Sequence, residues 1–534
     1  MKLSQILRFL ISFVLLLFSL FLLIPHNSSK ILVDPSQIWS LEGQVSQSIS
    51  PEDGAAYPPG SAINERELFL NYSNLRLEEI QAYASWNFND SNTGTITSPP
   101  FSLPKILSIY VTGYPSYSEN SVFLLDIQNN QKLVLSCRDP GENWVNFNWL
   151  IPDTWVNKHV KLVAIDNSKE RYDWLGGRGA WLGVSSPFAI DMFTYIQLQI
   201  RSNSLLLGLY SILFILFFLS GLMLSYPFIK FLSNASYISF TVIISNSILG
   251  YTLFWLYFFN HSLGMFSSIV VFLLSIIFLT NKSGQKFLSY TLRSTEFLYP
   301  TLMQFIVGCI YLLILNSSET SISFDLGALA QSRFFPRFPL DNVVPMMFSD
   351  YLVNGSDPRD IKNYIGTLSS DRPPLQAGLS LIQSYLSTLE PYIYIMQSSY
   401  IYPIYSIILQ CFWVCTSWSV YRVIGLTISR TTLAILIMST SGFFLFNSIF
   451  TWPKLLASSF FMIVFYFCLD AYLNNRDFKD FEYLIIFLCL FLSLLSHTGI
   501  AFSILGLVSS LLVIGRKKLD RKSTRLNSSH EFVS

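Results

Sequence analysis

Residues 205–224, LLLGLYSILFILFFLSGLML, decide the class of this protein. These 20 residues carry no charged side chain, and about 20 apolar residues are what an α-helix needs to cross a bilayer. The whole chain agrees, because 51% of its 534 residues are hydrophobic and 13% are charged, where soluble domains carry about 25% charge. The composition therefore excludes a single water-soluble domain and a disordered chain, and it predicts a polytopic membrane protein.

Further apolar runs lie on both sides of this stretch. The apolar run 6–24 has two basic residues at its start, Lys2 and Arg8, and no small-residue cleavage site after it, so residues 1–25 are expected to be an uncleaved anchor. Residues 482–515 are expected to form two short helices with a turn at 497–499, and one crossing plus a re-entrant piece is the alternative. About ten transmembrane helices are thus expected. The remaining runs cover residues 204–226, 236–258, 264–281, 297–316, 400–423, 432–450 and 455–474.

The basic residues predict the orientation of these helices. Lys and Arg concentrate in alternate connections, with Lys454 as the exception, and short connections rich in Lys and Arg remain in the cytoplasm. One alternation fits every connection, which places the N-terminus in the cytoplasm and residues 26–203 and 317–399 outside. We expect the membrane to be a bacterial inner (plasma) membrane. The net charge of +1 gives no field that would attract nucleic acid.

The same patterns divide the chain into regions. After the anchor, residues 26–203 form an extracytoplasmic domain, residues 204–296 a three-helix membrane segment, and residues 297–519 a second membrane region with the outer loop 317–399. Residues 520–534 include KSTRLNSSH, which resembles a translated adaptor sequence, so we exclude this tail from fold reasoning and expect the natural protein to continue further.

Residues 26–203 alternate between apolar and polar side chains, as half-buried strands do. Short strands at regular spacing predict an all-β sandwich, jelly-roll-like, and a helical period is visible only around residues 75–84. Residues 152–166 and 181–185 resemble galactose-binding-type jelly rolls. A hairpin turn is expected at 126–131. The expected strands cover residues 106–112, 122–127, 132–136, 145–150, 160–165 and 181–185.

Seven of the eleven tryptophans lie in this domain. Aromatic rings stack on sugar rings, so Trp174 and Trp181 are candidates for contact with a glycan. The alternative is that each indole fills the sandwich core or meets the membrane surface.

The outer loop 317–399 carries a concentration of ionisable residues that is unusual for this chain. A loop this long is seldom a mere connector. Asp341 opens a segment with helical apolar spacing that runs to Gly355, and Arg372 precedes Pro373-Pro374-Leu375, where a new helix is expected to begin. The amphipathic run 376–389 is expected to lie along the outer membrane face, with Arg372 placed to bind a lipid phosphate.

This order of residues resembles the polyprenyl-phosphate-dependent glycosyltransferases of the GT-C class, in the protein O-mannosyltransferase-like, aminoarabinose-transferase-like and rhizobial lipopolysaccharide transferase-like groups. The matching positions are Asp341, Gly355 and the Arg372-Pro-Pro-Leu element, over about 200 residues from Leu298 onward. The resemblance implies that Asp341 is the general base for the acceptor hydroxyl and that Arg372 contacts the donor phosphate. Asn342 departs from the family's Asp-Glu pair, and Asp325 is the alternative base.

The resemblance also implies the reaction: inverting transfer of a hexosyl or pentosyl group from a polyprenyl-phosphate sugar to a glycan, lipid or protein acceptor. Lys454 and His497 are further candidates for the donor phosphate, and capping a turn is the alternative role for His497. The sequence predicts no metal ligands and no certain cofactor, and it does not decide whether a divalent cation takes part.

Other functions are compatible with the same sequence. A transporter or flippase of lipid-linked glycan would place ionisable or broken-helix elements near the membrane midplane, whereas the predicted spans are nearly free of charge. A non-catalytic membrane subunit would bind glycan through the sandwich. A glycan polymerase or ligase is a further enzymatic alternative.

Overall fold

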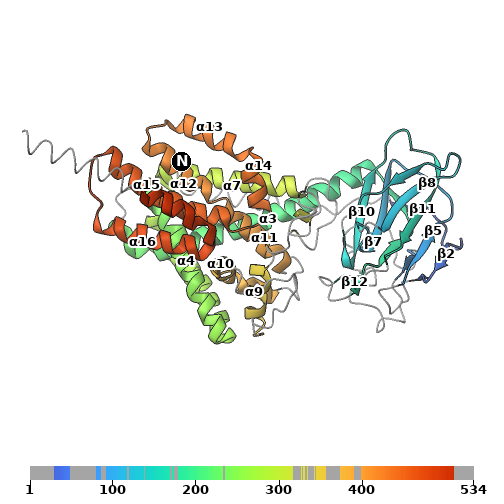
Figure 1. The fold of residues 1–534 in the computed structure, drawn as a ribbon, viewed down its shortest axis with the longest axis horizontal. Helices are drawn as coiled ribbons and strands as arrows, with labels where there is room; N and C mark the ends of the chain where they lie inside the picture. The colour runs from blue at the N-terminus through green and yellow to red at the C-terminus, as the bar shows by residue number, and fades with distance from the viewer. Residues whose placement is uncertain are drawn as a thin grey trace, which may run out of the picture.

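The computed structural model describes residues 29–47, 80–85, 92–116, 119–137, 139–168, 171–172, 178–231, 235–316, 326, 329–330, 334, 342, 344–356, 373–389 and 398–509. These residues form a β domain and a helical bundle. The long helix α3 (Met192–Ser225) begins against the β domain and continues into the bundle (Figure 1).

Two antiparallel sheets make up most of the β domain. The first has the order β1-β15-β7-β14-β4-β3, with β10 also paired to β7, and the second has the order β2-β5-β11-β8-β9, with β6 also paired to β11. The strands of the first sheet are β1 (Ser29–Ile31), β3 (Ser46–Gln47), β4 (Ala82–Ala84), β7 (Ile106–Gly113), β10 (Gly141–Leu150), β14 (Leu182–Ser185) and β15 (Phe188–Ile190). Those of the second are β2 (Ser40–Gly43), β5 (Gly94–Thr97), β6 (Phe101–Ser102), β8 (Asn120–Asp126), β9 (Lys132–Val134) and β11 (His159–Asp166), while β12 (Arg171–Tyr172) and β13 (Arg178–Gly179) pair separately.

The sandwich prediction is confirmed, and each of the six expected strands has a counterpart. The hairpin between β8 and β9 closes through the backbone N–H of Asp126, which donates to the carbonyl of Gln131 at 2.9 Å, with Asn130 at φ 53°. The expectation of a helix around 75–84 is wrong for the last residues of that stretch. Ala82–Ala84 forms the buried strand β4, which pairs with β14 on one side and β3 on the other. Pairing with strands distant in sequence overrides the local pattern there. The galactose-binding-type fold remains an expectation.

The first sheet is buried on both faces at β7. Leu107, Ile109 and Val111 point into the core between the two sheets, whereas Ile106 and Tyr110 belong to a second cluster that includes Leu198 of α3. This second cluster explains why every residue of β7 is buried, where a strand with one wet face would alternate between buried and exposed residues. The sandwich is therefore packed directly on the start of α3.

The bundle contains α3 and the helices that follow it. These are α4 (Ala235–Phe259), α5 (His261–Thr280), α6 (Lys282–Arg293), α7 (Thr295–Asn316), α9 (Val344–Val353), α10 (Leu375–Leu381), α11 (Ser398–Gln410), α12 (Trp413–Val423), α13 (Ile428–Ser439), α14 (Gly442–Ile449), α15 (Lys454–Leu473) and α16 (Asp480–Ser496). The shorter 3-10 helices are η3 (Tyr226–Phe231), η7 (Ser384–Leu389) and η9 (Thr498–Ile500).

Within the described residues, six helical stretches are long and apolar enough to cross a membrane, or seven if the bent pair α13–α14 is one span. The protein is thus an integral membrane protein by the length and composition of its helices, but the expected ten spans are not confirmed. The run 6–24 lies outside the described residues. In 482–515, α16 ends at Ser496 and helical structure resumes at Thr498, so the chain breaks at the predicted turn.

Polar contacts sort the helix ends into two groups. At what we call the charged end, Arg422 of α12 pairs with Glu296 of α7 at 3.0 Å, and the Tyr237 hydroxyl of α4 donates to Glu482 of α16 at 3.2 Å. At the opposite, loop end, Asn316 of α7 donates to the hydroxyl of Ser202 in α3 at 3.1 Å. This grouping agrees with a path that alternates between two membrane faces.

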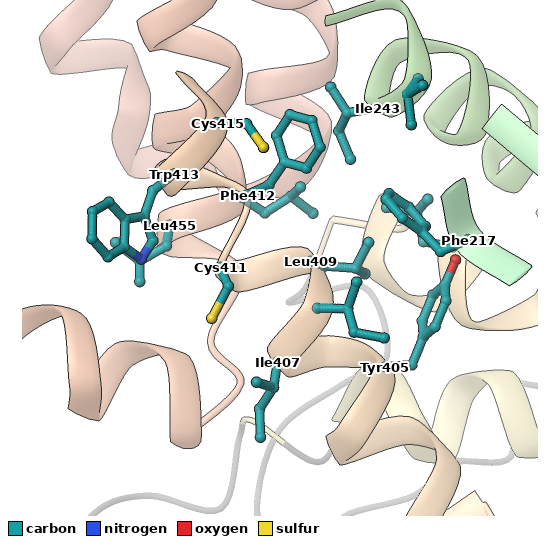
Figure 2. Close-up of a cluster of buried hydrophobic side chains, with 14 of the residues drawn as sticks. Phe217, Ile243, Tyr405, Ile407, Leu409, Cys411, Phe412, Trp413, Cys415 and Leu455 are labelled. Atoms are coloured by element: carbon teal, nitrogen blue, oxygen red, sulfur yellow. The ribbon is translucent and has the colours of Figure 1, made fainter. Parts of the chain in front are cut away.

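The middle of the bundle is apolar. Figure 2 shows side chains from α3, α4, α11, α12 and α15 meeting around Phe412, with Tyr405 beside Phe217 at a ring-centroid distance of 6.0 Å. Cys411 and Cys415 are fully buried free cysteines in this cluster, where they pack with the apolar side chains.

Candidate functional site

The outer loop contributes α9 to the loop end of the bundle. This helix ends in a Schellman arrangement, in which the N–H of Ser356 donates to the carbonyl of Tyr351 at 2.9 Å and that of Gly355 to Leu352 at 3.3 Å. Gly355 has φ +69°, and a Cβ there would lie 3.0 Å from the His261 ring. The glycine of the sequence motif therefore ends α9 and allows close contact with the start of α5.

The second contribution of the loop is α10, and here the sequence expectation is wrong. The amphipathic run 376–389 does not form one helix on the membrane face: α10 ends at Leu381, η7 follows, and six of the seven residues of α10 are buried. Glycines let α10 enter the bundle, because a Cβ on Gly378 would lie 2.5 Å from the carbonyl oxygen of Gly250 in α4. The polar residues of the run bind partners inside the protein.

A small pocket opens between α9, α10 and α11 at the loop end. Its polar lining combines one carboxylate, Asp350, with hydroxyl groups and the amide of Gln383. Such a set can bind a ligand that carries several hydroxyl groups, and a carboxylate can also accept a proton from one of them. The lining residues are Ser349, Asp350, Val353, Ser380, Leu381, Gln383, Ser384, Ile401 and Tyr402.

Hydroxyl contacts fix one wall of this pocket to α4 and α5. The Oγ of Ser384 lies 2.6 Å from the hydroxyl of Tyr257, and the hydroxyl of Ser268 donates to the carbonyl of Leu381 at 3.0 Å. Buried hydroxyl groups in hydrogen bonds hold a wall more rigidly than apolar contacts alone.

Amide side chains fix the opposite wall. The Nε2 of Gln376, which is 1% exposed, donates to the hydroxyl of Tyr402 at 2.7 Å and to the carbonyl of Thr451 at 2.8 Å. The Nε2 of Gln410 donates to the Oε1 of Gln376 at 3.3 Å. Tyr402, one of the pocket residues, is thereby tied to α10 and to the turn before α15.

Four of the predicted site residues, Asp341, Asp325, Arg372 and Trp174, lie outside the described residues. The residue after Asp341 is described: Asn342 is 4% exposed, and its side-chain amide donates to the carbonyl of Phe450 at 2.9 Å.

Lys454 is the first residue of α15, at the loop end. Its Nζ lies 3.5 Å from the centroid of the Trp452 ring. The turn that precedes it contains Thr451, at φ 59°, whose carbonyl accepts the hydrogen bond from Gln376. Lys454 therefore lies close in sequence to the amide network, and its contact with the donor phosphate remains a prediction.

His497 and Trp181 occupy structural positions. The Nδ1 of His497 accepts the backbone N–H of Gly499 at 3.1 Å, which is the turn-capping role. Trp181 is 2% exposed, so its indole is buried in the β domain and is not open to stacking on a glycan.

Sequence reasoning missed three residues at the pocket and its network. Asp350 is one of many ionisable residues in the outer loop, and nothing in the sequence distinguishes it from the others. Gln376 and Gln410 lie in segments that are predicted to be helices because of their apolar residues, so the two amides drew no attention. Amide side chains inside apolar helices were the available signal, because such groups are costly in a membrane unless they are hydrogen-bonded. Within the described residues, no three His, Cys, Asp or Glu side chains cluster as metal ligands would.

Comparisons with known proteins give little more. No protein-family model and no curated protein matches the chain. Among solved structures, the C-terminal extracellular domain of Mycobacterium tuberculosis EmbC is similar at 15% sequence identity and a TM-score of 0.21. The match covers 30% of this chain and 60% of that chain, and a similarity this low carries no argument about fold or function.

Proposed function

We propose that this chain is a membrane glycosyltransferase that moves a sugar from a polyprenyl-phosphate donor to an extracytoplasmic acceptor. The observation that carries the proposal is the pocket between α9, α10 and α11, where Asp350 lies among hydroxyl and amide groups at the loop end of the bundle. This lining matches the chemistry of a sugar, and the surrounding apolar helices match that of a prenyl chain.

The contacts of Tyr402 support a role for the two residues assigned by resemblance. Its hydroxyl lies 3.5 Å from the carbonyl of Asn342 and 2.7 Å from Gln376. Asn342 follows Asp341, and Gln376 is four residues after Arg372. The proposal is that Asp341 deprotonates the acceptor hydroxyl, Arg372 contacts the donor phosphate, and Asp350 binds a hydroxyl group of the sugar.

The chemistry needs no prior activation of the donor. A sugar on a polyprenyl phosphate already carries a good leaving group, so the protein must accept the proton of the acceptor, stabilise the departing phosphate and hold the reactants together. A new glycosidic bond forms as the bond from the sugar to phosphate breaks, with inversion at the sugar carbon.

Transport of a lipid-linked glycan is the second candidate, because α13 and α14 form a broken helix bent by 67°. The hydroxyls of Ser439 and Thr440 donate to carbonyls of their own helix at the break, and the neighbouring Phe443 is 60% exposed. The break thus faces outward, where a transport site would face a protein-lined cavity. We therefore prefer the transferase.

The test is transfer of labelled sugar from a set of polyprenyl-phosphate sugars by the full chain in membranes. Asp341→Asn is expected to abolish transfer while donor binding is retained, and Asp350→Asn to raise the KM for the sugar substrate. Asp480→Asn, an exposed carboxylate at the charged end, is the control and should transfer normally. Turnover that persists in Asp341→Asn would reject the base, and glycan movement across vesicles without transfer would favour the transporter.

A further inference from the structure

The helix α6 connects two membrane spans at the charged end of the bundle. Asn281 ends α5 and also caps the start of α6, where its side chain accepts the N–H of Ser283 at 3.0 Å. At the other end only Ser294 separates α6 from α7. The 12 residues of α6 make a helix about 18 Å long, which is too short to cross a hydrocarbon layer of about 30 Å. Both ends of α6 therefore lie at one membrane face, and the helix between them stays at that face.

The protein covers one side of α6. The buried residues of this helix are Gly284, Phe287 and Thr291. The ring centroid of Phe287 lies 5.6 Å from that of Tyr226 in η3, and a Cβ on Gly284 would collide with the carbonyl oxygen of Phe278 in α5. These contacts fix which side of α6 faces the bundle, so the opposite side faces away from it.

That opposite side carries all the basic residues of α6. Successive residues of an α-helix are about 100° apart, so Lys282, Lys286 and Arg293 fall within about 40° of one another. All three are exposed, and we call them the basic stripe. Tyr290, which is 52% exposed, lies beside the basic stripe on the same side of the helix.

The basic stripe has no counter-charge from the described part of the protein. None of its three cationic groups takes part in an ion pair or a hydrogen bond with a described residue. The sequence of α6 contains no acidic residue, and Glu296, just beyond it in α7, is paired with Arg422 at 3.0 Å. Three positive charges on one helix side are thus available to a partner from outside the chain.

We propose that the basic stripe binds the phosphate groups of anionic membrane lipids. A helix that connects two spans lies at the depth of the lipid headgroups, and both Lys and Arg bind phosphate. Aromatic side chains are typical of the same depth, and besides Tyr290 the neighbouring η3 presents Phe228, which is 48% exposed. The inference is independent of the proposed function, because α6 lies at the charged end and the pocket at the loop end.

The test compares the binding of two lipids to the full chain in detergent. Phosphatidylglycerol and phosphatidylcholine both contain a phosphate, but only the first has a net negative charge. Attraction to anionic lipid strengthens binding about fivefold for each basic residue nearby, so a headgroup that meets two residues of the basic stripe gains on the order of tenfold. Wild type should therefore prefer phosphatidylglycerol by about tenfold, and the preference should decrease as the salt concentration rises. The triple variant Lys282→Gln, Lys286→Gln, Arg293→Gln should lose it.

A second triple variant controls for the change in net charge. Lys30→Gln, Lys132→Gln, Lys161→Gln removes three charges from the sandwich instead, and it should keep the wild-type preference. Lys282→Arg combined with Lys286→Arg retains the charge of the basic stripe and should keep the preference as well. Thermal unfolding without added lipid checks that each variant is folded, as expected for exposed side chains.

Three results would overturn the inference. The first is a preference that survives in the variant without the basic stripe. The second is a preference that is lost equally in the sandwich variant, since net charge alone would then explain it. The third is equal affinity of wild type for the two lipids, which would leave this side of α6 to water or to a soluble acidic partner. Millimolar inorganic phosphate should not displace phosphatidylglycerol, and displacement would show a site for a free anion in place of a lipid headgroup.

Discussion

At the scale of single residues, Asp166 shows how folding sets the chemistry of a side chain in the sandwich. It is 2% exposed on β11, where it accepts the hydroxyl of Ser85 and the N–H of Ser168 at 3.1 Å. Burial raises the pKa of this carboxyl to about 6, although both hydrogen bonds act in the opposite direction. Its charge thus depends on whether the domain is folded.

This shift predicts a pH dependence of stability. Because the folded pKa lies above the unfolded value, the contribution to stability is complete below about pH 4 and is lost as the pH rises through about 6, by an amount on the order of 3 kcal/mol. Asp166→Asn should remove this loss and unfold at a higher temperature than wild type at neutral pH. Thermal unfolding of the full chain in detergent, followed at several pH values, measures it.

The control for this prediction is Asp153→Asn. Asp153 is exposed and pairs with Lys105, whose hydrogen bond lowers the pKa of the carboxyl. This variant should leave the stability loss through pH 6 in place. If wild type and Asp166→Asn show the same pH dependence, Asp166 does not titrate as described.

At the scale of elements, the contact between α10 and α4 determines whether the pocket can form. The two helices meet at Gly250 and Gly378, and a Cβ on Gly250 would lie 2.9 Å from the Cα of Leu379. Small residues are what allow two backbones to approach this closely in a membrane protein. The pocket residues Ser380 and Leu381 follow directly on α10.

Gly378→Ala should therefore move α10 away from α4. We expect a loss of about 1–3 kcal/mol in stability from overpacking and a loss of ligand binding at the pocket. Gly208→Ala in α3 is the control, because a Cβ there meets nothing within 4 Å and alanine favours a helix by up to about 1 kcal/mol. Unfolding in denaturant and ligand binding are measured for both, and unchanged binding in Gly378→Ala would contradict the account of α10.

The sequence predicted the spans α3, α4, α5, α7 and α15 well, because apolar length alone determines where a helix can cross a bilayer. It also predicted the strands of the sandwich from their alternation. It did not predict α10, whose polar side chains look solvent-facing until their partners are known. Gln376 bonds to Tyr402, 26 residues away, and to Thr451, 75 residues away, and no local pattern carries such pairings.

At the scale of the whole molecule, the sandwich, α9, α10 and the turn before α15 all lie toward the loop end, and the pairs Glu296–Arg422 and Asp470–Arg476 lie at the charged end. The charge pattern of the sequence assigns the charged end to the cytoplasm. The site would then face the extracytoplasmic side, where polyprenyl-linked sugars are used according to the proposal.

Cysteine labelling tests this sidedness. Val134→Cys places a thiol on an exposed strand of the sandwich, and Gln285→Cys places one on the exposed side of α6. In intact cells an impermeant thiol reagent should label Val134→Cys and leave Gln285→Cys unlabelled over the same reaction time. In permeabilised cells the reagent should label both variants. The reverse pattern would invert the orientation and place the pocket in the cytoplasm.

The most direct test of the central claim is photocrosslinking with a polyprenyl phosphate that carries a photoreactive group near the phosphate, followed by mapping of the labelled peptides. The account predicts labelling in α9, in the stretch from α10 to η7 and in the first turn of α11, reduced by competing unlabelled polyprenyl phosphate. Competable labelling confined to the α13–α14 break or to the charged end would contradict it.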